Sequence, residues 1–210
     1  MHASAPFLLL ISAPSGAGKT TIANALRTEL GLHSPASRVA LIREDDYYRD
    51  QSHLKFEQRL QTNYDHPAAL EHSLLRDHLH ELQQGAAVEI PSYDYTQHTR
   101  SDKTYTQAPV DVLILEGILL FSNAELLQLY DLRVFVHSPL EQCLQRRIAR
   151  DTAERGRTHA DVEAQFEACV VPMYHEYLHI WQQQADVVID NTNFQPASTL
   201  ALVRQKLALG

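Results

Sequence analysis

A glycine-rich segment, Ala13-Pro14-Ser15-Gly16-Ala17-Gly18-Lys19-Thr20, links two patterned stretches of the chain. Residues 7–13 form an apolar run typical of a buried strand, and residues 20–30 carry apolar side chains at helical spacing. We expect that helix to end at Gly31, in the C′ position that glycine favours. Strand, glycine-rich loop and helix, in this order, match the phosphate-binding pattern G-x-x-x-x-G-K-[ST], although Ala13 stands in place of its first glycine.

Each residue type in this loop suits a phosphate ligand. Glycines let successive backbone N–H groups point inward at phosphate oxygens, and the N-terminus of the following helix adds partial positive charge. Lys19 can reach the β- and γ-phosphates, and the Thr20 hydroxyl can bind Mg²⁺. The residues predicted to hold a phosphate donor are Ser15, Gly16, Ala17, Gly18, Lys19, Thr20 and Thr21.

A second apolar run, residues 110–115, ends in Glu116 and supplies the other half of a nucleotide site. Ligands of open α/β sheets bind at the carboxyl ends of the strands, so we expect Glu116 to hold Mg²⁺ together with Thr20. Three further strands are predicted at residues 38–42, 132–136 and 187–189. Strands that alternate with helices indicate an α/β fold, a doubly wound parallel sheet with helices on both faces.

The remaining elements follow from spacing and from turn residues. His66-Pro67 is predicted to open a helix that ends at Gly85, and residues 88–95 and 103–107 are predicted to pair as a hairpin arm, about 87–107. Further helices are expected at residues 140–150, from about 160 with an interruption at Pro172, and from about 197. No stretch has the composition of a linker, so we expect one domain over residues 1–210.

Composition limits the partners of the chain. Its 18 Lys+Arg against 26 Asp+Glu give a net charge of −8, which disfavours binding to duplex nucleic acid. Two cysteines without paired spacing argue against a disulfide framework or a zinc site and favour a reducing, cytoplasmic compartment. No apolar stretch approaches the roughly 18 residues of a membrane span, so we expect no membrane partner.

The scarce positive charges are concentrated in one segment. Five of the 14 arginines fall within 12 residues: Arg146, Arg147, Arg150, Arg155 and Arg157. We expect this segment, about 146–165, to form a lid that closes over phosphates and neutralises transferring charge. A P-loop alone fits a GTPase, a motor ATPase or a small-molecule kinase. The absence of an N-K-x-D motif weakens the GTPase interpretation, and the lid favours the kinase.

Several segments together resemble the uridine kinase (uridine–cytidine kinase) family, in order from about residue 7 to 189. The segments are Asp45-Asp46-Tyr47-Tyr48, Asn63-Tyr64-Asp65-His66-Pro67, Ile90-Pro91-Ser92-Tyr93-Asp94-Tyr95, His98-Thr99-Arg100, Leu115-Glu116-Gly117-Ile118-Leu119, Arg146-Arg147-Ile148-Ala149-Arg150-Asp151 and Glu154-Arg155-Gly156-Arg157. The resemblance implies a P-loop NTPase fold with a five-stranded parallel sheet, a hairpin arm and an arginine-rich lid. It also implies Mg²⁺-dependent transfer of the γ-phosphoryl group of ATP or GTP to the 5′-hydroxyl of uridine or cytidine.

The resemblance further implies roles for single residues in the reaction. Asp45 matches the catalytic base, although the adjacent Asp46 could share that role. Arg150 and Arg155 match lid arginines that face the phosphates, and with Lys19 and Asp45 they complete the predicted catalytic set. The family is typically a homotetramer inhibited by CTP or UTP, so the resemblance implies both properties for this chain.

A second group of residues matches the nucleoside-binding positions of the family. Asp65 matches the carboxylate that binds ribose hydroxyls, with a helix cap as its alternative role. Tyr93 and His98 match the residues that hydrogen-bond the pyrimidine. Tyr48 either lines the nucleoside pocket or packs beneath it. The remaining matches to substrate-contacting positions are Arg147, Arg157 and Gln165.

The match weakens near residue 190, where relatives often read Pro-Arg-Gly and this chain reads Asp190-Asn191-Thr192-Asn193. That segment lies near the donor base in the family, so the choice between ATP and GTP stays open. Two other functions also stay open. One is a kinase for another hydroxyl acceptor, such as phosphoribulose or pantothenate, which Tyr93 and His98 oppose. The other is a regulator that binds a nucleotide without catalysis.

Overall fold

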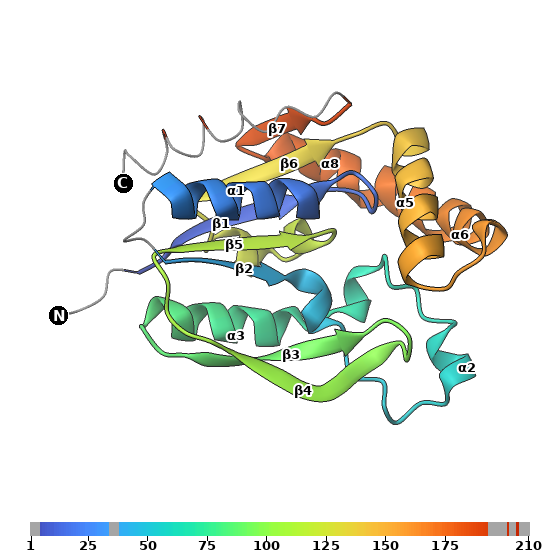
Figure 1. The fold of residues 1–210 in the computed structure, drawn as a ribbon, viewed down its shortest axis with the longest axis horizontal. Coiled ribbons are helices and arrows are strands. Elements are labelled where there is room, and N and C mark those ends of the chain that lie inside the picture. The colour runs from blue at the N-terminus through green and yellow to red at the C-terminus, as the bar shows by residue number, and fades with distance from the viewer. Residues whose placement is uncertain (1–4, 34–37, 193–200, 202–204, 206–210) are drawn as a thin grey trace.

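A five-stranded parallel sheet forms the centre of the computed structural model, which describes residues 5–33, 38–192, 201 and 205 (Figure 1). The strand order is β2–β5–β1–β6–β7, and every pairing is parallel. The strands are β1 (Phe7–Ser12), β2 (Val39–Arg43), β5 (Val112–Gly117), β6 (Leu132–His137) and β7 (Val187–Asp190). The predicted α/β fold with five parallel strands is confirmed.

The register of the central strands brings the two halves of the predicted nucleotide site together. All of β5 and nearly all of β1 are buried, as expected for strands covered on both faces. Ile11 pairs with Glu116, and Ser12 pairs with Gly117. The glycine-rich loop therefore leaves β1 directly beside the carboxyl end of β5.

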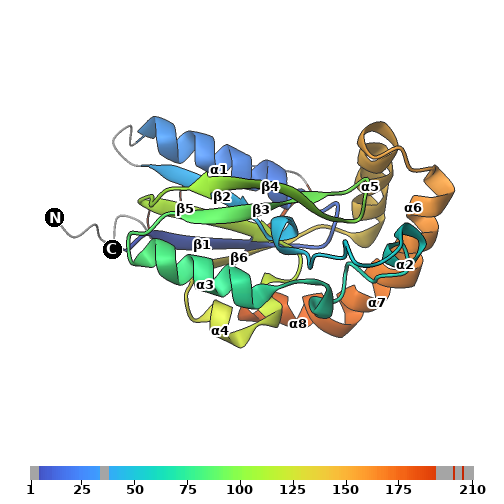
Figure 2. The ribbon, with the colours of Figure 1, turned by 90° about the horizontal axis from the view of Figure 1, so that it is seen from below.

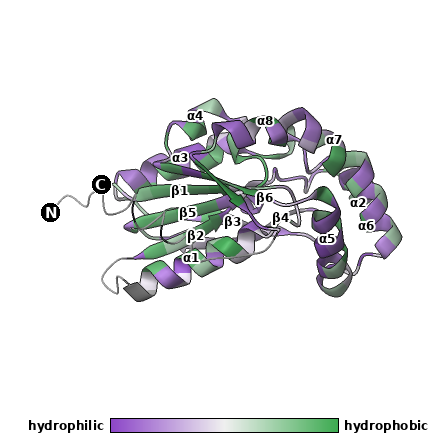
Figure 3. Cartoon of the chain, turned by 90° about the horizontal axis from the view of Figure 1, so that it is seen from above, coloured by the Kyte–Doolittle hydropathy of each residue, from purple (hydrophilic) through white to green (hydrophobic). Residues whose placement is uncertain are grey.

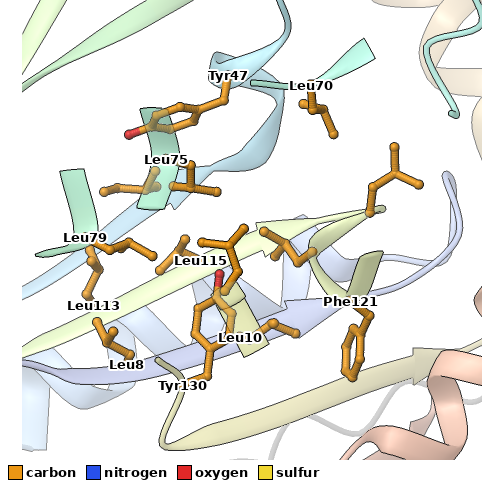
Figure 4. Packing of buried hydrophobic residues seen from close by; sticks show 14 of the residues in the cluster. Leu8, Leu10, Tyr47, Leu70, Leu75, Leu79, Leu113, Leu115, Phe121 and Tyr130 are labelled. Atoms are coloured by element: carbon orange, nitrogen blue, oxygen red, sulfur yellow. The ribbon is translucent and has the colours of Figure 1, made fainter. Parts of the chain in front are cut away.

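Helices cover both faces of the sheet, and successive side chains of β1 point alternately to one face and to the other. Figure 2 shows α1 (Lys19–His33) on one side and α3 (His72–Gln83) with α4 (Ala124–Leu127) on the other. Leu8 and Leu10 belong to the core cluster that includes residues of α3, shown in Figure 4. Leu9 and Ile11 belong to the cluster beneath α1. Figure 3 shows the apolar strands between helices of mixed hydropathy.

Two predicted helix boundaries in the first half of the chain are wrong. The helix α1 continues through Gly31 to His33, and Gly31 is not among the described glycines with positive φ. A glycine inside a helix costs only about 0.5–1 kcal/mol, so it does not have to end one. Pro67 opens only the short η2 (Pro67–Ala69), because Leu70 is extended and bridges to Tyr48.

The helical region predicted from about residue 160 is also more continuous than expected. It runs through α6 (His159–Gln165), α7 (Val171–Met173) and α8 (His179–Trp181), joined by the π-helical segments η4 (Phe166–Val170) and η5 (Tyr174–Leu178) and followed by η6 (Gln182–Gln184). Pro172 does not interrupt it. Pro172 lies in the first turn of α7, a position at which proline is tolerated.

The predicted lid lies at the end of the sheet toward which the strands point, and the turn of the hairpin arm, which runs beside α3, lies at the same end (Figure 1). The arm pairs β3 (Val88–Asp94) with β4 (Thr99–Gln107), so its second strand begins earlier than predicted. The predicted lid, about 146–165, includes the second part of α5 (Leu140–Glu154) and all of α6. Short elements complete the fold: η1 (Glu44–Tyr47), α2 (Phe56–Arg59) and η3 (Leu120–Ser122).

No helix among the described residues has the length and apolar character to cross a bilayer. The helix predicted from about 197 lies largely outside them.

Candidate active site

The glycine-rich loop has backbone torsions and contacts that only glycine permits at two positions. Gly16 and Gly18 have φ values of 87° and 92°. A Cβ on Gly16 would lie 2.1 Å from the Cys143 carbonyl oxygen, and one on Gly18 would lie 2.5 Å from the Asn191 side-chain nitrogen. Ala13, in contrast, is buried without a positive φ. The first glycine of the pattern is therefore not required here.

The residues predicted to hold Mg²⁺ lie next to each other. The Thr20 hydroxyl donates to Glu116 Oε1 at 3.0 Å. Glu116 is 5% exposed, and its Oε2 has no hydrogen-bond partner among the described residues. Burial raises the pKa of Glu116, and Lys19 opposes that shift. A buried, unpartnered carboxylate oxygen beside a hydroxyl fits a hard cation that is otherwise held by phosphates and water.

Asp45 follows β2 in η1 and is half-buried, and it lines the cavities described below. The Tyr95 hydroxyl donates to its Oδ2 at 2.7 Å. Asp46 points elsewhere, because its buried carboxylate accepts hydrogen bonds from Arg43 at 3.1 and 3.3 Å and from Tyr105 at 3.3 Å. Of the two adjacent acids, only Asp45 lines a cavity.

A third acid fixes the direction in which this segment points. Glu44 is fully buried, and His72 Nε2 lies 2.8 Å from its Oε1. The backbone N–H of Leu119 donates to its other carboxylate oxygen at 2.8 Å. A Cβ on Gly117 would overlap Glu44, at 2.1 Å. Glu44 therefore anchors η1 to both β5 and α3 immediately before Asp45.

Two adjoining cavities meet at Asp45. One, of about 930 Å³, lies over the glycine-rich loop and is also lined by Glu116, Arg146 and the hairpin arm. The other, of about 590 Å³, lies between the hairpin arm, α2 and the lid. Seven residues line both cavities: Lys19, Asp45, Tyr93, Tyr95, Thr96, Arg150 and Arg155.

Aromatic side chains line the smaller cavity. Tyr48 contacts Tyr93 with ring centroids 5.0 Å apart, and its hydroxyl donates to the backbone of Tyr64 at 2.9 Å. Tyr48 therefore both packs and lines the cavity. His98 lies 5.5 Å from the Tyr64 ring and is the only described non-glycine residue with positive φ, 51°. Burial, followed by the nearby Arg157, lowers the pKa of His98, so the ring is neutral at pH 7.

The lid side of this cavity brings together four residues that the sequence predicted as substrate contacts. Asp65 is buried, 3.8 Å from Arg147, and burial raises its pKa although Arg147 opposes the shift. Gln165 Oε1 accepts hydrogen bonds from Arg147 at 3.1 Å and from Arg157. The N-cap of η2 is His66, so Asp65 does not cap a helix.

Asp151 lies at the centre of the lid arginines. Its side chain is fully buried, and Arg150 donates to it at 2.8 Å. Arg147, Arg155 and Arg157 each lie 3.5–3.6 Å from it. One carboxylate therefore contacts arginines of both cavities. Arg146, the fifth arginine of the cluster, instead donates to Ser138 and to the backbone of Asn191.

Comparisons with known proteins identify the family of the chain. A family model described as Phosphoribulokinase / Uridine kinase family matches residues 8–197. The chain belongs to this family. A uridine kinase of Shewanella amazonensis is 44% identical over 189 residues, which cover 90% of this chain and 89% of that protein. A uridine kinase of Streptococcus thermophilus is 45% identical over 184 residues, 88% of this chain and 85% of that protein.

Solved structures of lower identity support the fold of this family member. A D-glycerate 3-kinase from Cryptococcus neoformans has a TM-score of 0.61 at 20% identity, covering 81% of this chain and 78% of that one. A shikimate kinase from Bacteroides thetaiotaomicron has a TM-score of 0.54 at 14% identity, covering 96% and 98%. Kinase-family membership and the uridine kinase relatives make the chain a phosphotransferase.

The sequence analysis of this kinase missed two side chains of the site. Tyr95 carried no predicted role, although it lies two residues after Tyr93 and so shares its side of the strand pattern. Asp151 also carried none, although it follows Arg150 and lies four residues after Arg147, on the same helical face. Both spacings are visible in the sequence, but the contacts with Asp45 and with the distant arginines are not.

Proposed function

We propose that this chain is a uridine kinase, which moves the γ-phosphoryl group of ATP or GTP to the 5′-hydroxyl of uridine or cytidine and yields UMP or CMP for pyrimidine salvage. The junction of the two cavities carries this proposal. A phosphate-binding loop lines one cavity, an aromatic pocket forms the other, and Asp45 lines both. The uridine kinases at 44–45% identity support the same acceptor.

The donor phosphates bind to the loop from Ser15 to Thr21. Its backbone N–H groups, including those of Gly16, Ala17 and Gly18, point at phosphate oxygens, and Lys19 contacts the β- and γ-phosphates. Thr20 and Glu116 would hold Mg²⁺, which neutralises charge on these oxygens when bound.

Asp45 acts as the general base of the transfer. It accepts the proton of the 5′-hydroxyl as that oxygen forms its bond to the γ-phosphorus, while the bond from phosphorus to the ADP oxygen breaks. Arg150 and Arg155 stabilise the charge on the transferring group. The single hydrogen bond from Tyr95 occupies Oδ2 and leaves Oδ1 for the proton.

The nucleoside binds in the aromatic cavity. Asp65 accepts hydrogen bonds from the two ribose hydroxyls, which a carboxylate can do together. Tyr93 and His98 read the pyrimidine edge, and a neutral imidazole offers both a donor and an acceptor. Contacts from the lid to the acceptor come from Arg147, Arg157 and Gln165.

The family resemblance supports further parts of the proposal. Residues 1–210 form one kinase domain, with a lid at about 146–165 and a hairpin arm at about 87–107. The enzyme is cytoplasmic and homotetrameric, and CTP or UTP inhibits it.

The test is a coupled assay of ADP release over a panel of acceptors, with ATP and GTP as donors. Uridine and cytidine should give turnover, while pantothenate and ribulose 5-phosphate should not. Lys19→Ala should abolish the signal, which excludes a contaminating kinase. Turnover with uridine and cytidine no greater than with buffer would overturn the proposal. Turnover only with another acceptor would support a different kinase, and none with any acceptor would support a nucleotide-binding regulator.

A further inference from the structure

Tyr95 connects the candidate base to the lid. Its hydroxyl donates to Asp45 Oδ2 at 2.7 Å, and the guanidinium carbon of Arg155 lies 4.2 Å from the centroid of its ring. It follows β3 directly, at the start of the hairpin turn, and lines both cavities. One side chain of the arm therefore contacts η1 on one side and the end of α5 on the other.

We propose that Tyr95 is a positioning residue for phosphoryl transfer, an inference that rests on the proposed function. Its hydrogen bond fixes the rotation of the Asp45 carboxylate, so that Oδ1 faces the attacking hydroxyl. A hydrogen bond to an ionised carboxylate is strong enough to hold one side-chain orientation. Burial and the neighbouring Asp45 raise the pKa of Tyr95, so its phenol stays protonated and keeps donating.

The ring of Tyr95 positions a second group. A cation over a tyrosine face is attracted by the ring, and Arg155 has this geometry. Arg155 also lies 3.6 Å from Asp151. The ring and Asp151 together hold Arg155 at the junction of the cavities. The base and one phosphate-facing arginine therefore depend on the same tyrosine.

Two substitutions separate the hydroxyl from the ring. Tyr95→Phe removes only the hydroxyl, so kcat should fall about 10-fold while the KM values for uridine and ATP stay within about 2-fold. Tyr95→Leu also removes the ring, so the KM for ATP should rise several-fold in addition. Tyr93→Phe, two residues earlier and still in β3, is the matched variant, and it should raise the KM for uridine more than it lowers kcat. Thermal unfolding of each variant checks that the fold is kept.

Each variant is assayed with the acceptor that the wild-type chain phosphorylates best. If that acceptor is not a pyrimidine nucleoside, the proposed function is wrong. The role of Tyr95 is then still tested, because the kcat of each variant is measured with the acceptor that the wild type does phosphorylate. An unchanged kcat in Tyr95→Phe overturns the positioning role. An effect on KM alone also overturns it, because a residue that only packs against substrate would behave in that way.

Discussion

The donor half of the candidate site is built from backbone, and the acceptor half is built from side chains. Gly16 and Gly18 have positive φ, and contacts with Cys143 and Asn191 leave no room for a Cβ. Apart from Lys19 and the pair Thr20 and Glu116, the phosphate-binding groups of that half are N–H groups that any residue of suitable torsion supplies. Side-chain substitutions at the other loop positions should therefore matter less than changes to backbone shape.

The acceptor half depends on particular side chains that come from separate segments. Asp65 follows α2, Arg147 belongs to α5, Gln165 ends α6, and Tyr93 belongs to the hairpin arm. None of these contacts is replaced by backbone when a side chain is lost. The difference predicts that single substitutions in the acceptor half and at the junction change catalysis more than conservative ones in the loop.

The largest effect is expected at the junction of the two halves. Asp45→Asn should lower kcat by about 10²–10⁴-fold, the usual contribution of a general base, and keep the KM for uridine within about 3-fold. The matched variant Asp46→Asn should keep kcat within about 3-fold, because an amide oxygen can still accept from Arg43. Steady-state kinetics of both variants decides between the two acids. Near-wild-type kcat in Asp45→Asn would remove it from the base role.

The next effect concerns the centre of the lid. Asp151→Asn removes the charge that four arginines share, so the KM values for ATP and for uridine should both rise, by about 10-fold each. Urea unfolding should show a loss of about 1–3 kcal/mol, less than for a fully buried pair because Arg150, Arg155 and Arg157 are partly exposed. Glu163→Gln, at an exposed acid of α6, is the control. A rise in only one of the two KM values would show that Asp151 does not serve both halves.

A smaller effect is expected for the proposed pyrimidine contact. His98→Ala should raise the KM for uridine by about 3–10-fold, the value of one hydrogen bond, with little change in kcat. His80→Ala, at an exposed histidine of α3, controls for the loss of an imidazole. An unchanged KM in His98→Ala would exclude it from base recognition.

The pH dependence tests the same histidine without a mutation. The pKa of His98 is lowered from the usual histidine value of about 6.5, by burial first and by Arg157, Arg155 and Arg59 next. The ring of His98 in the folded chain therefore stays mostly neutral as the pH falls to about 6.5, and it gains its proton only at lower pH. The KM for uridine should stay flat from about pH 8 to 6.5 and rise at lower pH. His98→Ala should lose this rise, and a rise that persists in the variant would assign it to another group.

The same shift has a consequence for stability. The unfolded chain binds this proton at a higher pH than the folded chain does, so stability falls as pH drops from about 6.5 toward the lowered pKa of His98. Well above a pH of about 6.5 neither state is protonated, and the group has no effect. Urea titrations of wild type and His98→Ala across this window measure the difference.

The parts of the fold that the sequence predicted correctly are encoded locally. The strand before Ala13 and the strand before Glu116 are continuous apolar runs, which a buried parallel sheet requires at those positions. The wrong boundaries arose where the local pattern was not sufficient. Leu70 is extended because it pairs with Tyr48, and Pro172 lies in the first turn of α7, where proline is tolerated, so the helical region continues.

The candidate site also has a part that the sequence predicts and a part that depends on the folded structure. The loop glycines and Lys19 were predictable, since a phosphate cradle is a local pattern. The choice between Asp45 and Asp46 was not, because it depends on Arg43 and Tyr105 reaching Asp46 in the folded chain. The direction of a side chain in a short turn follows from its tertiary neighbours.

The smallest effect is expected where this chain departs from the loop pattern. Ala13→Gly restores the usual first glycine, yet the KM for ATP should stay within about 2-fold, because Ala13 already has torsions that an alanine accepts. Stability should fall by about 0.5–1 kcal/mol, since the glycine loses more conformational freedom on folding. Gly16→Ala is the reference, because its Cβ would overlap the Cys143 carbonyl and should displace the loop. If Ala13→Gly lowered the KM for ATP markedly, Ala13 would be a strained position, and the donor half would depend on this side chain after all.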